Sequence, residues 1–253
     1  MNNNFALHFV FMSIAFFYIE NIAANETTIT LNEETSKHVV QVLRMQVGAQ
    51  LQLTDGNGNL VSTEVSDNNK KKCVVKIINS ANVQRPTTNV SIAVSLIKNS
   101  SRFEWFLEKA TELGVTEIIP LLCERTEKEK FRLDRMKNIL VSAMLQSQQC
   151  WLPVLYEPVP YEKLWQGVET LPKVEVYQQK FIAHCIETEK RNLADMVNEN
   201  LSSKIILIGP EGDFTAEEVQ SAVDHHFIPV ALGNTRLRTE TAGIVAATLL
   251  CLV

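Results

Sequence analysis

A short loop with an unusual mix of residues gives the first sign of chemistry in this chain. Gly209-Pro210-Glu211-Gly212 follows an apolar run at residues 204–208 and precedes a helix start at Thr215. Such loops often bind phosphate through free backbone N–H groups, but proline has no N–H and glutamate would repel phosphate. Neither GxGxxG nor GK[ST] is present. The loop therefore favours an adenosine-type ligand without phosphates, with an ordinary tight strand–helix connection as the alternative.

A second loop, LGNTRLRTETAG at residues 232–243, concentrates charged groups at the start of the last helix. Arg236 and Arg238 flank Leu237, and small residues follow that would let another helix or a crossing chain segment approach closely. The structural alternative is a charged helix start in which Glu240 interacts favourably with the helix dipole. The two loops lie one strand and one helix apart, which favours a shared site over two unrelated features.

Alternating strands and helices must position these loops. Apolar runs predict strands at residues 90–97, 116–122, 180–185, 204–208 and 227–232, and helices over 101–114, 132–149, 189–200, from about 215 and from about 240. Ser101 and Glu104 are expected to form a capping box, as are Thr215 and Glu218. This alternation predicts an α/β domain with a mostly parallel sheet covered on both faces. Because ligands bind at the carboxyl ends of strands in such sheets, the loops after residues 185, 208 and 231 should form the site.

The first third of the chain has a different pattern of apolar and polar residues. Residues 28–80 contain short alternating runs, a strong hairpin turn at Asp55-Gly56-Asn57-Gly58 and one short amphipathic piece, HVVQVLRM, before Gly48. These signals predict a small β-rich module, expected to be a barrel. The predicted division is a module at residues 12–82, a linker at 83–89 that contains Pro86, and an α/β domain at 90–253.

The N-terminal residues raise the question of export. Residues 5–19 are apolar enough to resemble a signal peptide, but no Lys or Arg precedes them and the run is too short to span a bilayer. We therefore expect Met12 to be the natural start, with a first strand in FFYIE and residues 1–11 as extra sequence. A cleaved, exported form is the alternative.

Composition and charge restrict the class of protein. The net charge of −5 argues against non-specific coating of nucleic acid but leaves room for a local basic face. The five cysteines are widely spaced and form no CxxC pair, so neither a disulfide framework nor a zinc site is predicted. Each cysteine is expected to be a small buried residue. These features indicate a reduced, cytoplasmic compartment, with no metal and no membrane span.

The two loops together resemble the signature of the 16S rRNA uracil-N3 methyltransferase family, in the SPOUT superfamily of knotted, S-adenosylmethionine-dependent enzymes. Three further segments are similar to that family: HVVQVLRMQVG at 38–48, LIKNSSRFEWFLEKATELGVTEIIPL at 96–121 and MLQSQQCWLP at 144–153. The resemblance thus extends over nearly the whole chain. It departs from the family at Asp213, where many members have glycine, and at Gln148 and Gln149, where many have an arginine.

The resemblance implies an architecture and a cofactor. The N-terminal module would be a PUA-like, RNA-binding β-barrel, and the C-terminal segment of the SPOUT α/β domain would pass through a deep trefoil knot. Family members bind S-adenosyl-L-methionine in the knot and work as homodimers through the knot helices, a use that suits the small residues Ala242, Gly243, Ala246 and Ala247. The residues that would bind the cofactor are Ala183, His184, Ile208, Gly209, Pro210, Glu211, Gly212, Leu232, Gly233, Asn234, Leu237, Arg238, Thr239 and Thr241.

The implied reaction is methyl transfer to N3 of a uracil in 16S ribosomal RNA, either free or within the assembled small subunit. This nitrogen carries a proton, so the enzyme needs a base or a cation that stabilises the uracil anion. Arg238 is assigned the electrostatic role, Glu240 is the first candidate for the base and Glu211 the second. The alternative for both carboxylates is that they hold the loop or the ribose hydroxyls.

Basic residues of both domains are candidates for RNA contacts: His38, Arg44, Lys98, Arg102 and Arg125. His38 and Arg44 could instead be structural, and the charged stretch around Arg125 could be a solvated face. Two other functions stay open at this point. One is a related methyltransferase that acts on tRNA or on a ribose 2′-hydroxyl, and the other is a catalytically silent RNA-binding relative.

Overall fold

The computed structural model describes residues 14–23, 26–127, 130–166, 171–187 and 189–252. Two compact units divide the chain, Met1–Gln84 and Arg85–Val253. The expected start at Met12 and the extra residues 1–11 lie outside the described residues. Within the described ranges, no helix is long and apolar enough to cross a membrane.

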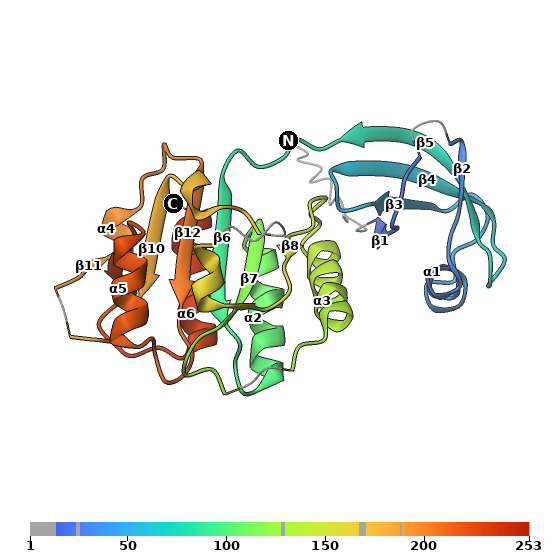
Figure 1. The fold of residues 1–253 in the computed structure, drawn as a ribbon. Helices are drawn as coiled ribbons and strands as arrows, with labels where there is room; N and C mark the ends of the chain where they lie inside the picture. The colour runs from blue at the N-terminus through green and yellow to red at the C-terminus, as the bar shows by residue number, and fades with distance from the viewer. Residues whose placement is uncertain (1–13, 24–25, 128–129, 167–170, 188, 253) are drawn as a thin grey trace, which may run out of the picture. The chain divides into compact units, whose positions relative to one another are not determined.

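The N-terminal unit is built on a five-stranded sheet in the order β1-β3-β4-β5-β2 (Figure 1). Its strands are β1 (Ala15–Tyr18), β2 (Thr28–Thr30), β3 (Gln50–Thr54), β4 (Asn59–Asp67) and β5 (Val74–Asn82). β1 runs parallel to β3, and the other pairs are antiparallel. The strand expected in FFYIE is therefore confirmed, whereas closure into a barrel remains a prediction.

The β3–β4 hairpin forms where the sequence predicted it. The carboxylate of Asp55 accepts hydrogen bonds from the backbone N–H of Asn57 (2.8 Å) and of Asn59 (3.3 Å). Gly56 and Gly58 take positive φ angles of 72° and 87°. These are conformations that glycine adopts without a steric penalty, so the turn and its sequence agree.

The predicted amphipathic segment HVVQVLRM begins as a π-helical stretch, η1 (His38–Val42), which continues from a short helix that was not predicted, α1 (Glu33–Lys37). Asn32 caps α1 by accepting the N–H of Thr35. The helical path ends at Arg44, which has a φ of 54°. Val39 on this segment is fully buried against Leu51, Val65 and other core residues of the sheet.

The C-terminal unit contains an eight-stranded sheet in the order β11-β13-β10-β12-β6-β7-β8, with β9 paired to β7. Every strand pair in it is parallel among the residues described, which confirms the predicted parallel sheet. The strands are β6 (Asn89–Ser95), β7 (Glu117–Leu122), β8 (Val154–Leu155), β9 (Val159–Pro160), β10 (Gln179–Ala183), β11 (Arg191–Asn192), β12 (Ser203–Ile208) and β13 (Ile228–Ala231).

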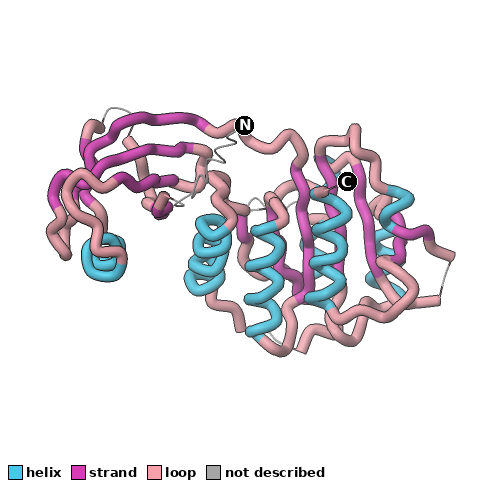
Figure 2. The backbone as a smooth tube through the Cα atoms, turned by 180° about the vertical axis from the view of Figure 1, so that it is seen from behind, coloured by secondary structure: helices cyan, strands magenta, loops and turns pink. Residues whose placement is uncertain are grey.

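Helices cover both faces of this sheet, so its strands read as continuous apolar runs. The helices are α2 (Ser100–Glu112), α3 (Leu133–Gln146), α4 (Leu193–Met196), α5 (Ala216–Asp224) and α6 (Thr239–Cys251), with short 3-10 turns η2 (Tyr161–Leu164) and η3 (Val174–Val176). Successive residues of β12 alternate between two cores: Ile206 packs with α2 and α6, and Leu207 packs with α5 and η2. Figure 2 shows α2, α3 and α6 side by side on one face.

Two local predictions are wrong. The first helix begins one residue earlier than expected, because Asn99, not Ser101, is the N-cap and accepts the N–H of Ser101 at 2.9 Å. Glu104 does not complete a capping box but forms a two-point ion pair with Arg135 of α3. The role of Glu104 therefore depends on a tertiary contact, whereas the Asn99 cap is a local feature.

The helix predicted over 189–200 is mostly absent. Arg191 and Asn192 instead pair with β13 as the edge strand β11, and only the four residues of α4 are helical. The side chain of Asn198 then accepts the N–H of Asn200, a local bond that competes with helix formation. In contrast, the capping box of Thr215 and Glu218 at the start of α5 is confirmed.

Candidate functional site

Three loops meet at the carboxyl ends of the neighbouring strands β13, β10 and β12 and enclose a cleft of about 720 Å3. They are the loops that follow residues 183, 208 and 231. The lining residues come from all three loops and from the start of α6: Ala183, His184, Cys185, Lys190, Ile208, Gly209, Pro210, Glu211, Asp213, Val230, Ala231, Leu232, Gly233, Asn234, Thr235, Arg236, Leu237, Arg238, Thr239 and Ala242. This is the edge at which open parallel sheets bind ligands.

Hydrogen bonds tie the middle loop to the other two. Asp213 adopts a φ of 64° and its carboxylate accepts the backbone N–H of Cys185 at 2.8 Å. On the other side, the hydroxyl of Thr239 donates to the carbonyl of Gly209 at 3.0 Å. A Cβ added to Gly209 would lie 3.0 Å from the ring of Phe214, so a side chain there would require Phe214 to shift. The three loops therefore form one connected frame.

Arg125, predicted to contact RNA, does not line the cleft but supports the middle loop through a hydrogen bond. Its guanidinium donates to the carbonyl of Gly212 at 2.8 Å, and its side chain lies 3.3 Å from where a Cβ on Gly212 would stand. The neighbouring N–H of Glu124 donates to Glu218 of the α5 capping box. Arg125 remains exposed, so bracing the loop leaves its outer surface accessible.

His184 is the most informative side chain of the cleft. It is buried, at 7% exposure, and within the described residues neither ring nitrogen has a hydrogen-bond partner. Burial, followed by the nearby ammonium of Lys190, lowers the pKa of His184 below its ordinary value, so the ring is neutral near pH 7. Lys190 is held in place by bonds to the carbonyls of His184 and Ile186, each 2.8 Å long. Because an unpaired buried polar group is costly, this imidazole is suited to exchange a hydrogen bond with a ligand in the cleft.

Glu211 and Arg238, two of the three residues assigned to catalysis, both line the cleft and are exposed. Glu211 accepts the backbone N–H of Lys98 at 3.1 Å, while the ammonium of Lys98 pairs with Glu127 at 2.6 Å. Arg238 is the N-cap residue of α6. A carboxylate and a guanidinium on facing loops give the cleft both an acceptor of protons and a stabiliser of negative charge.

Glu240, Gly212 and Thr241 do not line the cleft. Glu240 is buried on the far side of α6, with one carboxylate oxygen 3.7 Å from Arg102 of α2 and the other without a hydrogen-bond partner in the described structure. Arg102, predicted to contact RNA, therefore interacts with Glu240. The structure does not bring the first candidate for the base together with the other site residues.

The small residues of α6 pack within the chain itself. Gly243, Ala246 and Ala247 are buried, and a Cβ on Gly243 would lie 2.6 Å from the ring of Phe106 on α2. The expectation that these residues present a face to a second copy is therefore wrong. Ala242, the fourth small residue, lines the cleft.

Sequence reasoning missed Lys190 and Cys185. Lys190 was missed because residues 189–200 were predicted to form a helix. Cys185 is exposed in the cleft, which contradicts the expectation of a buried thiol, and Cys251 is only partly buried; Cys73, Cys123 and Cys150 are buried as expected. The nearest signal was the apolar run that ends at Cys185, which places the following loop at the sheet edge.

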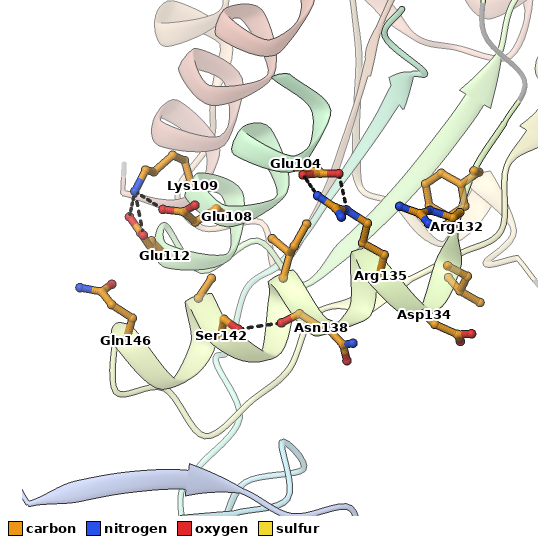
Figure 3. Close-up of a pocket in the computed structure, with 14 residues that line it drawn as sticks. Glu104, Glu108, Lys109, Glu112, Arg132, Asp134, Arg135, Asn138, Ser142 and Gln146 are labelled. Atoms are coloured by element: carbon orange, nitrogen blue, oxygen red, sulfur yellow. Dashed lines mark hydrogen bonds and ion pairs between the residues drawn. The ribbon is translucent and has the colours of Figure 1, made fainter. Parts of the chain in front are cut away.

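A larger cavity, of about 1230 Å3, lies between α2 and α3 (Figure 3). Arg135 pairs with both carboxylate oxygens of Glu104, at 2.7 and 2.8 Å, and Lys109 binds Glu108 and Glu112. These charged groups pair with one another, both between α2 and α3 and within α2. The groove thus lacks the unpaired buried group that distinguishes the smaller cleft.

The candidate RNA residues of the N-terminal unit are both exposed. The ring of His38 contacts Phe17 edge-on, with the centroids 5.5 Å apart. Arg44 occupies the left-handed turn that ends η1. Among the residues described, no group of three or more His, Cys, Asp or Glu side chains is arranged to hold a metal ion.

Comparison with known proteins gives a consistent result. The model of an RNA methyltransferase domain matches residues 83–251, and that of an RNA methyltransferase PUA domain matches residues 31–78. The ribosomal RNA small subunit methyltransferase E of Synechocystis is 30% identical over 230 residues, covering 87% of this chain and 72% of the relative.

Solved structures agree over almost the full length. A probable rRNA-methyltransferase from Porphyromonas gingivalis is 35% identical, with a TM-score of 0.83, and covers 92% of this chain and 95% of its own. The ribosomal RNA small subunit methyltransferase E from Neisseria gonorrhoeae, bound to S-adenosyl methionine, is 28% identical, with a TM-score of 0.79 and the same coverage. The matches confirm the resemblance seen in the two loops: the chain belongs to the RNA methyltransferase family that includes the small-subunit ribosomal RNA methyltransferases E.

Proposed function

We propose that this protein methylates N3 of a specific uridine in 16S ribosomal RNA, with S-adenosyl-L-methionine as the methyl donor. The observation that carries the proposal is the three-loop cleft with the unpaired, buried imidazole of His184. A relative with 28% identity and nearly complete coverage is described as bound to S-adenosyl methionine. The relatives' names supply the ribosomal RNA, and the family resemblance supplies the N3 position.

The cleft suits such a cofactor. Its volume of about 720 Å3 lies in the range of small-molecule sites. Gly209 and Gly233 line the cleft without side chains, so a ligand can approach their backbone closely, and Gly233 has a φ of 135°. Pro210 and Glu211 would oppose a phosphate but not an adenosine. When bound, S-adenosyl-L-methionine supplies an electrophilic methyl group on a positively charged sulfur.

Within this proposal the cleft residues act on the uracil. Arg238 stabilises the negative charge that develops when N3 loses its proton. Glu211, which faces the same cleft, becomes the first candidate for the base, because Glu240 is turned toward Arg102. Glu240 then serves as a positioning residue that fixes the start of α6. His184 donates or accepts a hydrogen bond with the cofactor as a neutral ring.

The family resemblance supports the finer architecture as part of the same proposal. It comprises a PUA-like barrel at residues 12–82, a linker at 83–89 and a SPOUT domain at 90–253 whose C-terminal segment is knotted. Homodimer formation would use the outer side of α6, where Ile244, Val245 and Leu249 are only partly buried, together with Trp105 of α2, which is 44% exposed. A helix that is apolar on every side is expected to be covered on every side. A ribosomal substrate supports the expectation that the protein acts in the cytoplasm.

The proposal is tested by methyl-transfer assays on naked 16S RNA, small-subunit particles and tRNA, followed by mapping of the modified atom. We expect one N3-methyluridine per 16S RNA. Product on tRNA or at a ribose oxygen would support a different RNA methyltransferase. Absence of S-adenosyl-L-methionine binding by calorimetry in the folded protein would indicate a catalytically silent RNA-binding relative. Lys98, Arg102 and Arg125 are the residues to replace when RNA contacts of the C-terminal unit are tested.

A further inference from the structure

A basic cluster at the tip of the β4–β5 hairpin is not explained by the cofactor cleft. Lys70, Lys71 and Lys72 are consecutive and exposed. Residues 1–84 contain six Lys or Arg and seven Asp or Glu, so half of the cations of this unit stand in one turn. Asp67 is nearby, and its carboxylate shapes the turn by accepting the N–H of Asn69 at 3.1 Å. The local concentration of charge, rather than the balance of the unit, indicates a binding surface.

A second segment, residues 42–47, lies beside this tip. The side chain of Asn68 donates to that of Gln46 at 3.5 Å, and the N–H of Gly48 donates to the carbonyl of Val65 at 2.9 Å. Since β3 and β4 pair in antiparallel fashion, the loop that leads into β3 emerges at the same end of the sheet as the tip that follows β4 (Figure 1). The two segments form one continuous edge.

The second segment exposes both a cation and apolar side chains. Arg44 holds a left-handed φ of 54°, which is uncommon for a residue other than glycine, and Gln46 fixes it by donating to its carbonyl at 3.1 Å. Val42, Val47 and Leu43 are 67%, 61% and 44% exposed. A strained backbone that displays apolar side chains next to cations is a recurring property of binding surfaces.

We infer that this basic edge, defined as residues 42–47 together with Lys70, Lys71 and Lys72, is where the N-terminal unit docks on RNA. The inference rests on the proposed function and deepens it by naming a surface. The lysines and Arg44 neutralise backbone phosphates, and the apolar side chains cover the sugar or base faces of unpaired nucleotides. An anionic membrane fits less well, because α1 and η1 have five residues each and form no long amphipathic helix.

The test compares a Lys70→Ser/Lys71→Ser/Lys72→Ser variant with the unaltered full chain in filter binding to naked 16S RNA across a salt series. Loss of three phosphate contacts should weaken binding about 10-fold or more near 0.1 M salt and reduce the slope of log affinity against log salt by about 2. Arg44→Asn, which keeps a residue that tolerates the left-handed turn, should weaken binding by a smaller factor. Lys76→Ser, on β5 outside the edge, is the matched control and should change little.

Calorimetry with S-adenosyl-L-methionine separates this inference from the proposed function. The variants should bind the cofactor as the unaltered chain does. RNA binding by the triple-lysine variant within twofold of the unaltered chain, at an unchanged salt slope, would overturn the inference. So would an unaltered chain that binds vesicles of anionic phospholipid through these lysines and binds 16S RNA without them. If RNA binding depends on the edge but no uridine is methylated, the docking surface stands and the proposed reaction fails.

Discussion

Buried polar groups at the two ends of the parallel sheet differ in whether they have hydrogen-bond partners. At the amino end, the carboxylate of Glu117 accepts hydrogen bonds from the hydroxyls of Ser91 and Tyr177, the latter at 2.7 Å, and from Asn89. At the carboxyl end, His184 is equally buried and has no partner within the described structure. A satisfied buried group contributes to the fold, whereas an unsatisfied one that lines a cleft favours a ligand there. We therefore expect the amino end of the sheet to contribute to stability and the carboxyl end to ligand binding.

The same contrast holds for the two cavities of the C-terminal unit. The larger one, between α2 and α3, is bordered by charges that pair with one another, and the smaller one contains His184. Size alone would favour the cavity between α2 and α3. The unpaired ring nitrogens of His184 favour the smaller cleft at the carboxyl edge of the sheet.

The largest effect is expected at Arg238. Arg238→Ala should lower turnover about 100-fold or more, because it removes charge stabilisation that develops only in the transition state. Its affinity for S-adenosyl-L-methionine should change by less than about threefold, and its stability should be unaltered. Single-turnover methyl transfer and calorimetry measure the two quantities. Arg236→Ala, in the same loop, is the matched control; equal losses of turnover and cofactor affinity in Arg238→Ala would contradict the assigned role.

A loss of stability without loss of affinity is expected at the amino end. Glu117→Ala leaves two buried donors, Ser91 and Tyr177, and the half-buried Asn89 without this acceptor, and it should lower the free energy of unfolding by about 3 kcal/mol. Urea denaturation measures this change. Glu108→Ala, on the surface of α2, serves as the control. If the folded Glu117→Ala protein bound S-adenosyl-L-methionine much more weakly, the separation between the two ends would be wrong.

At His184 we expect a loss of cofactor affinity without a loss of stability. His184→Phe keeps an apolar ring but removes both nitrogens, and we expect about a 10-fold loss of cofactor affinity, the order of one hydrogen bond, with equal or higher stability of the unliganded protein. Calorimetry and thermal unfolding without cofactor measure the pair of quantities. His226→Asn, at an exposed left-handed position, controls for loss of a histidine. Unchanged affinity in His184→Phe would remove His184 from the binding site.

The smallest expected effect is a dependence of stability on pH. Because burial and Lys190 lower the pKa of His184 in the fold, the unfolded chain takes up the proton first as the pH falls below the ordinary histidine value of 6.5. The stabilising contribution is therefore complete above pH 6.5 and is lost as the pH falls toward the folded pKa. Thermal unfolding of the protein without cofactor, measured between about pH 7 and pH 5, should show a steeper decline than in His184→Phe. Parallel profiles would show that His184 is not held neutral.

Features encoded by neighbouring residues were predictable from the sequence. The hairpin at Asp55, the capping box of Thr215 and Glu218 and the run of loops at the sheet edge all depend on residues within a few positions of one another. Such local signals do not need the tertiary structure, and the family resemblance of the two loops added the cofactor.

Features that depend on distant contacts were not predictable. Which side of α6 meets α2 decides that Glu240 faces Arg102 rather than the cleft, and nothing near Glu240 in the sequence states this. Arg125 donates a hydrogen bond to Gly212, which lies 87 positions further along the sequence. Lys190 lines the cleft, and it directly precedes β11 at the sheet edge, where the sequence had predicted a helix over 189–200.

The contact between Gly243 and Phe106 has a consequence for how this chain can vary. A Cβ at position 243 would collide with the ring at 2.6 Å, and the ring is fully buried, so it has no room to move aside. The two positions are therefore expected to change together. In chains that share this fold, an alanine in place of Gly243 should be accompanied by a smaller side chain in place of Phe106, and either change alone should be rare.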